Sequence, residues 1–214
     1  MKKGEKAVLR SEEPKVIHLV DYRPTPFRIE TIELDIDLYE DHAISRSVLD
    51  VRMVETGQDL VLDGVDLELL SLRVEGKDWG DYVQNGEKLV IKGLGSACKV
   101  ETISRLLPRA NKSCEGLYMS SGSYFTQCEA EGFRKITWFY DRPDVMARYT
   151  VSISADKKSF PVLLSNGNLF AKSDLENGRH RVTWVDPFPK PSYLFALVAG
   201  DFEVLRDQWV TPSG

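Results

Sequence analysis

Hydrophobic and acidic residues alternate strictly near the start of the chain. From Ile32 to Leu38 every second residue is aliphatic, and the residues between them are Glu or Asp. Because successive side chains of a strand point to opposite faces, this period of two predicts a strand with one buried face and one acidic, solvated face. Tyr149–Ala155 alternates in the same way and predicts another strand.

Shorter apolar segments extend this pattern along the chain. They predict further strands at Ser47–Val54, Leu60–Leu62, Leu67–Val74, Leu89–Lys92 and Arg181–Val185. Tyr193–Ala199 is continuously apolar, which is typical of a strand buried on both faces. One short helix is expected at Asp144–Arg148, because Pro143 suits its first turn.

Asn-Gly pairs occur at 85–86, 166–167 and 177–178. They favour hairpins, because a type I′ turn needs positive φ at both central residues. Short strands separated by such turns indicate an all-β, antiparallel, saddle-like or sandwich-like domain. We expect a single β domain over residues 15–214, preceded by a flexible, charged tail over residues 1–14.

Composition agrees with a globular protein, since 42% of residues are hydrophobic and 29% are charged. The net charge of −5 comes without a basic block, so no nucleic-acid partner is expected. We also expect no membrane segment, because no apolar run reaches the ~18 residues of a spanning helix. The N-terminus lacks the apolar core of a signal peptide.

Three cysteines, at positions 98, 114 and 128, form no CxxC pair. An odd, sparse set favours free thiols and a cytoplasmic location. The sequon Asn111-Lys112-Ser113 is the one feature that points to secretion.

Catalytic and metal-binding motifs are missing from the sequence. His18, His42 and His180 are far apart, and no His-Glu-x-x-His or Gly-x-Ser-x-Gly occurs. Cys128 has no adjacent base, so we interpret it as a small buried thiol. We therefore predict no catalytic residue, no metal ligand and no cofactor in this chain.

An acidic segment is the strongest candidate for binding. Gln127, Glu129 and Glu131 are spaced two residues apart, so on a strand they would share one face. Such a patch could hold an ammonium group through charge-assisted hydrogen bonds. From these residues alone, a solvated strand face with Glu131 paired to Arg134 is the simpler interpretation. Gly132 indicates a bulge or a close backbone approach.

A series of short motifs, in a fixed order, covers most of the chain from about Asp21 to Asp207. The motifs are Asp21-Tyr-Arg-Pro24, Leu60-Val-Leu-Asp-Gly64, Glu115-Gly-Leu-Tyr118, Thr126–Arg134, Asp141-Arg-Pro-Asp144, Ala155-Asp-Lys157, Phe160–Gly167, Asn177-Gly-Arg-His180 and Tyr193–Asp201. Together they resemble the N-terminal domain of the aminopeptidase N family of zinc aminopeptidases, in its bacterial, apicomplexan and plant branch.

The resemblance implies a saddle-like β domain that covers a separate, zinc-containing catalytic domain. In that family a carboxylate of the Gln-Cys-Glu-Ala segment grips the free α-amino group of a peptide substrate. By position this carboxylate is Glu129, and Gln127 would line the pocket for the first side chain. The resemblance also implies a cis peptide bond between Glu129 and Ala130. Glu131 receives no role.

The family's Gly-Ala-Met-Glu-Asn segment, zinc ligands and catalytic Tyr do not occur in these 214 residues. We therefore expect this chain to be inactive alone, with zinc in the catalytic domain that is absent from it. The alternative is a stand-alone β-sandwich module that binds a partner without catalysis.

Overall fold

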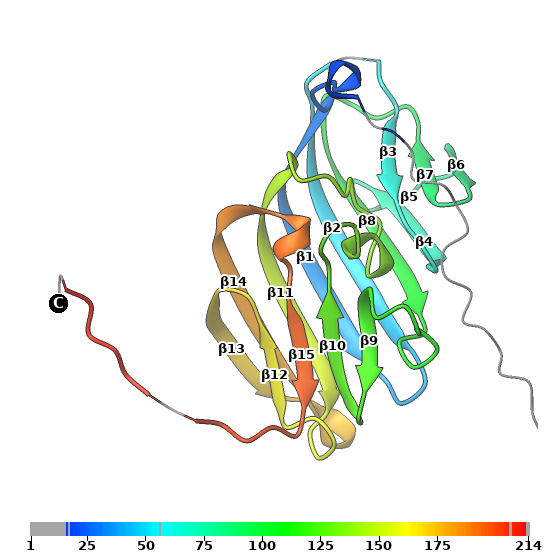
Figure 1. The fold of residues 1–214 in the computed structure, drawn as a ribbon. Coiled ribbons are helices and arrows are strands. Elements are labelled where there is room, and N and C mark those ends of the chain that lie inside the picture. Colours follow the sequence, from blue (N-terminus) through cyan, green and yellow to red (C-terminus); the bar gives the residue numbers. More distant parts are fainter. Residues whose placement is uncertain (1–15, 17, 56, 206, 213–214) are drawn as a thin grey trace, which may run out of the picture.

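The computed structural model describes residues 16, 18–55, 57–205 and 207–212, whose strands form three sheets (Figure 1). The eight-stranded sheet has the order β13 (Asn168–Asp174), β14 (Arg179–Pro191), β11 (Met146–Asp156), β1 (Phe27–Leu38), β2 (Ala43–Met53), β8 (Ala97–Leu106), β4 (Glu68–Val74) and β5 (Lys77–Asp78). The four-stranded sheet has the order β12 (Val162–Ser165), β15 (Leu197–Gly200), β10 (Ser123–Gln127) and β9 (Gly116–Ser120). A three-stranded sheet is formed by β3 (Leu60–Asp63), β7 (Lys88–Ile91) and β6 (Tyr82–Asn85).

This architecture confirms the all-β prediction. Helical residues within the described part are confined to four 3-10 turns: η1 (Leu19–Asp21), η2 (Phe133–Lys135), η3 (Glu176–Gly178) and η4 (Ser192–Leu194). The predicted tail over residues 1–14 lies outside the described residues.

Burial along β1 follows the alternation of aliphatic and acidic residues that predicted this strand. Its aliphatic residues from Ile32 to Leu38 are at most 1% exposed, and the acidic residues between them are partly or fully exposed. The strand begins earlier than predicted, at Phe27, because a bulge between Ile29 and Thr31 restores the inward direction of Phe27 and Ile29. β1 pairs in parallel with β11, and the other pairings of the described strands are antiparallel.

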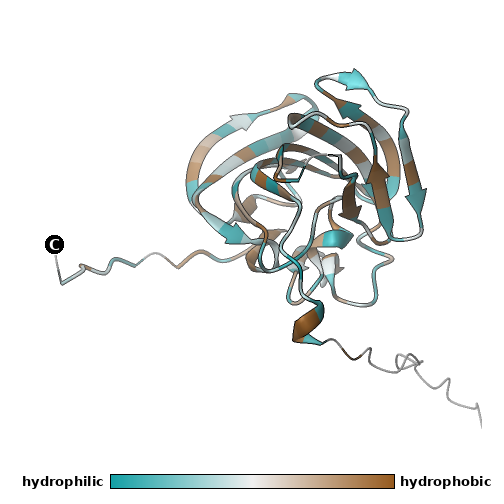
Figure 2. Cartoon of the chain, turned by 90° about the horizontal axis from the view of Figure 1, so that it is seen from above, coloured by the Kyte–Doolittle hydropathy of each residue, from teal (hydrophilic) through white to brown (hydrophobic). Residues whose placement is uncertain are grey.

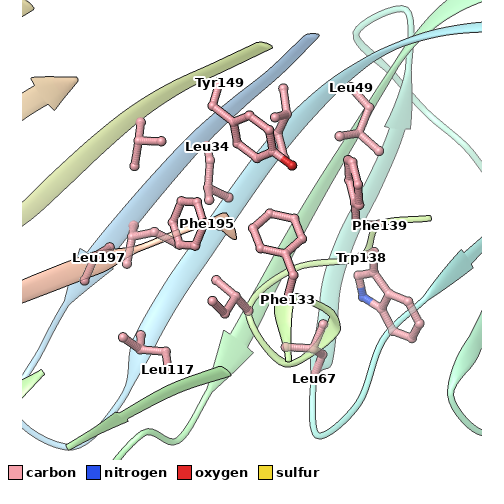
Figure 3. Close-up of a cluster of buried hydrophobic side chains, with 14 of the residues drawn as sticks. Leu34, Leu49, Leu67, Leu117, Phe133, Trp138, Phe139, Tyr149, Phe195 and Leu197 are labelled. Carbon is pink, nitrogen blue, oxygen red and sulfur yellow. The ribbon is translucent and has the colours of Figure 1, made fainter. Parts of the chain in front are cut away.

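The core lies between the large sheet and the two smaller ones. Seen from above, the long strands curve over the remaining elements (Figure 2). Leu34 and Tyr149 of the large sheet face Phe133 and Phe195 in this core (Figure 3). The Phe133 ring lies 5.9 Å from that of Tyr149 and 5.1 Å from that of Phe195.

The helix predicted at Asp144–Arg148 is wrong. Val145 N donates to Arg142 O at 3.1 Å in a tight turn, and β11 begins at Met146, which pairs with Pro191 of β14. Pairing with a distant strand therefore determines the secondary structure of this segment and overrides the local preference of Pro143 for a helix start.

Two other predictions need correction. Tyr193–Ala199 is not one strand buried on both faces, because η4 occupies its start, Leu194 and Ala196 are exposed, and β15 begins at Leu197. Asn166-Gly167 does not form a hairpin, since it connects β12 to β13, which lies in another sheet. The pairs at 85–86 and 177–178 do join antiparallel neighbours, β6 to β7 and β13 to β14.

Candidate functional site

The acidic segment lies at the end of a β-hairpin. β10 pairs with β9 up to Gln127, which lies opposite Gly116. The chain then leaves the sheet and forms a turn over residues 128–132, called here the acidic turn, which leads into η2. Gly132 N closes this turn by donating to Cys128 O at 2.8 Å. The prediction that Glu129 and Glu131 lie on a strand is therefore wrong.

The side chains follow the alternation of a strand only in part, because Ala130, which a strand would turn to the same side as Cys128, is exposed. Gln127, Glu129 and Glu131 are exposed, whereas Cys128 is 1% exposed. The peptide bond between Glu129 and Ala130 is cis, which confirms the bond geometry that the family resemblance implies. Polar groups are thus presented outward from a turn instead of a flat strand.

Two glycines allow the acidic turn to pack closely on β9. A Cβ atom on Gly132 would lie 2.2 Å from Gln127 O and 2.9 Å from Gly116 N, which backbone atoms cannot accommodate. Gly116 has a φ of +71°, and a Cβ there would lie 2.9 Å from Gly132 O. The close approach predicted from Gly132 is confirmed, although it occurs in a turn.

An ion pair and a buried carboxylate hold the far side of the turn. Glu131 Oε1 lies 3.2 Å from Arg134 Nη2, the pairing that the sequence suggested. Arg134 also donates from its backbone N and from Nε to Asp141 Oδ2, both at 3.1 Å. Burial opposes the charge of Arg134, but the carboxylates of Asp63, Asp141 and Glu131 outweigh it and raise the pKa of the guanidinium.

Asp141 belongs to a polar cluster that the sequence did not predict. Its backbone N donates to Asp63 Oδ2 at 3.2 Å, and Asp63 also accepts from Lys88 Nζ. Ser192 Oγ donates to the other carboxylate oxygen of Asp141. In the sequence these aspartates mark turns, and only the fold brings residues 63, 88 and 141 together.

Glu129 differs from its neighbours because its carboxylate has no hydrogen bond or ion pair to any described residue. The side chain of Gln127 is likewise exposed and unpartnered within the described part. Beside the turn lies an open cleft of about 320 Å³, lined by Ala130, Glu131, Arg134 and Lys135 among others. The arrangement offers one uncompensated carboxylate on a well-supported turn.

The remaining candidates have structural surroundings. Burial and the nearby Asp141 raise the pKa of the Cys128 thiol, so it is protonated near neutral pH and is a poor nucleophile. His180 Nε2 hydrogen-bonds Phe160 O at 2.8 Å, and His42 Nδ1 lies 2.6 Å from Asp41. His18 is exposed. The described residues contain no group of three His, Cys, Asp or Glu side chains placed to hold a metal ion.

The sequon asparagine has a structural role. Asn111 Nδ2 donates to Glu115 O at 2.7 Å and to Leu117 O at 3.0 Å, so attachment of a sugar would disrupt this loop. All three cysteines, at positions 98, 114 and 128, are free thiols.

Comparison with known proteins decides the family. Residues 22–194 match the family described as Peptidase M1 N-terminal domain. The chain belongs to this family. It is 49% identical to Aminopeptidase N of Caulobacter vibrioides over 211 residues, and 46% identical to Aminopeptidase N of Escherichia coli over 205 residues. These matches cover 96% and 95% of this chain and, in each case, 24% of the relative.

Solved structures of an aminopeptidase and of an M1 zinc metallopeptidase share this fold. Aminopeptidase A of Legionella pneumophila, solved in complex with aspartic acid, has a TM-score of 0.82 at 36% identity and matches 86% of this chain with 22% of its own. An M1 zinc metallopeptidase of Deinococcus radiodurans, solved with a Tyr-Ser-Ala substrate, has a TM-score of 0.73 at 19% identity over 82% of this chain and 42% of its own. This M1 chain spans about a quarter of the length of its curated relatives.

Among the residues that the structure describes, there is no helix with the length and apolar character needed to cross a membrane.

Proposed function

We propose that this chain is the substrate-anchoring domain of a zinc aminopeptidase that removes N-terminal residues from peptides. In this proposal the carboxylate of Glu129 binds the free α-ammonium group of the substrate, and Gln127 lines the pocket for the first side chain. The observation that carries the proposal is the isolation of Glu129. It is exposed, it has no partner among the described residues, and its neighbour Glu131 is already paired with Arg134.

Such an arrangement suits an enzyme that acts only at a free amino terminus. A fixed carboxylate sets the distance between the ammonium group and the scissile bond, and it rejects peptides whose amino group is blocked. Zinc, held by the part of the protein outside this chain, would polarise the scissile carbonyl and lower the pKa of a bound water. The free thiols at positions 98, 114 and 128 support a cytoplasmic location for the whole protein.

The partner of this domain would be the catalytic domain of the same polypeptide, docked on the outer face of the four-stranded sheet. Tyr118, Phe125, Val198 and Leu164 are cross-strand neighbours, one from each strand of that sheet. Leu164 is 43% exposed and the other three are half-buried, so this apolar row extends across the outer face. Phe202 lies edge-on to Phe125, with ring centroids 6.0 Å apart.

The position of the apolar row supports the catalytic domain as the partner that docks on it. β10 and β15 are antiparallel, so the acidic turn after Gln127 and the chain exit after Gly200 lie at opposite ends of the sheet (Figure 1). A catalytic domain that both follows β15 and places its substrate at Glu129 has to reach both ends. It would thereby cover the apolar row between them.

Replacing Glu129 with Gln in the full-length protein tests the proposal. Loss of a buried charge partner costs about 2–5 kcal/mol, so kcat/KM for peptides with a free amino group should fall by roughly thirty-fold or more. The melting temperature should stay nearly constant, because Glu129 has no protein partner among the described residues. Glu131→Gln is the matched control, since it makes the same chemical change at a carboxylate already paired with Arg134.

Unchanged kcat/KM in Glu129→Gln would overturn the anchoring role. So would equal losses in the two variants, because the assignment requires Glu129 to differ from Glu131.

A further inference from the structure

Arg134 is the point at which the acidic turn is attached to the protein interior. Its side chain is 16% exposed and reaches two carboxylates, those of Glu131 and Asp141. Nε donates to Asp141 Oδ2 at 3.1 Å, and Nη2 donates to the backbone O of Asp141 at 2.9 Å. The same Nη2 lies 3.2 Å from Glu131 Oε1. One guanidinium therefore connects an exposed residue of the turn to a buried one.

The buried end of this connection is held from several directions. The Asp141 side chain is 1% exposed and accepts hydrogen bonds from Ser192 Oγ, from Arg134 Nε and from the backbone N of Arg134. Its backbone N is bound by Asp63, which is itself paired with Lys88 of β7. Strand β3, strand β7 and η4 thus contribute to fixing the height and orientation of Arg134.

We propose that Arg134 is a positioning residue for the ammonium site. It ties the acidic turn to Asp141, and it neutralises Glu131 so that Glu129 is the turn's single uncompensated carboxylate. This inference rests on the proposed function, because it assigns Arg134 an effect only through Glu129. Arg134 itself makes no contact with substrate in this scheme.

The geometry requires arginine and not simply a positive charge. The planar guanidinium donates from Nε and Nη2 in fixed directions, which lets it bind a carboxylate oxygen and a backbone oxygen of Asp141 together. A lysine ammonium is a point charge on a flexible stem and cannot reproduce this pair of directions. Arg134→Lys therefore keeps the charge and loses the positioning.

The test measures how strongly the full-length, zinc-loaded protein uses the amino group of a ligand. Dissociation constants are determined by calorimetry for leucine hydroxamate and for the same hydroxamate without its α-amino group. The dissociation constant of the amino-free ligand divided by that of leucine hydroxamate measures how much the ammonium site contributes to binding. Arg134→Lys should lower this ratio at least five-fold while the constant of the amino-free ligand stays within two-fold. Glu131→Gln should leave the ratio within two-fold, because the amide oxygen can still accept a hydrogen bond from Arg134 Nη2 and the charge that is removed is already neutralised.

Glu129→Gln distinguishes a failure of the positioning role of Arg134 from a failure of the proposed function. If it collapses the ratio and Arg134→Lys does not, the positioning role is overturned and the proposed function stands. If Glu129→Gln leaves the ratio unchanged, the proposed function fails and the inference fails with it. Equal weakening of both ligands in Arg134→Lys would mean a merely structural role and would also overturn the inference.

A second variant covers the case in which Arg134→Lys does not fold. Asp141→Asn keeps both heavy-atom positions of the carboxylate and weakens its hold on Arg134. It should lower the ratio at least five-fold, again without a change in the amino-free ligand. An unchanged ratio in Asp141→Asn would contradict the positioning role.

Discussion

At the scale of single residues, pairing and burial decide which chemical groups are available. Glu129 and Glu131 have the same side chain and lie two residues apart, yet only Glu131 is paired with a cation. Cys128 and Cys114 differ in the same way, since Cys128 is 1% exposed and Cys114 is exposed. The sequence shows the residue types, but the surroundings that set their reactivity come from other segments.

The three cysteines allow a test of whether burial sets the reactivity of a side chain. The thiolate is the form that attacks an alkylating reagent, and burial raises the pKa of both Cys98 and Cys128. At pH 8 an alkylating reagent should therefore modify Cys114 in the folded chain well before the other two, and all three should react once the chain is unfolded. Peptide-resolved mass spectrometry would measure the three rates. Modification of Cys128 as fast as Cys114 in the folded chain would contradict the burial described here.

At the scale of elements, local patterns predicted most strands and two of the three Asn-Gly hairpins, but not the segments whose structure depends on distant partners. β1 and β11 could be predicted because burial of one sheet face imposes a period of two on adjacent residues. The segment 144–148 could not, because its partner Pro191 is far away in the sequence. The same limit applies to the candidate site. Gln127 and Glu129 are proposed from the family motif, whereas the contact between Asp63 and Asp141 leaves no local signal in the sequence.

The link between β12 and β13 shows what a connection requires. Gly167 has a φ of +86°, and a Cβ there would lie 2.3 Å from Val185 O and 2.6 Å from Asp186 Cα. Gly178 has a similar φ of +72°, but nothing lies within 4 Å of its Cβ position. Gly178→Ala should lower the free energy of unfolding by about 1–2 kcal/mol, the cost of placing alanine in the left-handed conformation. Gly167→Ala should cost more, because rigid backbone has to move as well.

Urea denaturation of the two variants would measure the difference. Equal losses of stability would show that the close approach at Gly167 has no energetic consequence, and a smaller loss for Gly167→Ala would contradict the packing itself.

At the scale of the whole molecule, the two ends of the four-stranded sheet carry different features. One end carries the acidic turn, supported by Phe133 in the core and by Arg134 on Asp141. The other end carries the exit of the chain after β15. The apolar row between them lies on a sheet that is already formed in this chain, so in the proposed docking it would be a preformed surface for the partner domain.

Cysteine substitution on that surface gives a direct test of domain docking. Leu164 of the apolar row is 43% exposed, and Leu70 on β4 in the large sheet is 49% exposed. In this chain alone, Leu164→Cys and Leu70→Cys should react with a thiol reagent at similar rates. In the full-length protein Leu164→Cys should be protected at least ten-fold relative to Leu70→Cys, because the catalytic domain would cover the row. Peptide-resolved mass spectrometry separates these thiols from the native ones, and equal labelling of both variants in the full-length protein would place the catalytic domain on another face while leaving the role of Glu129 to its own test.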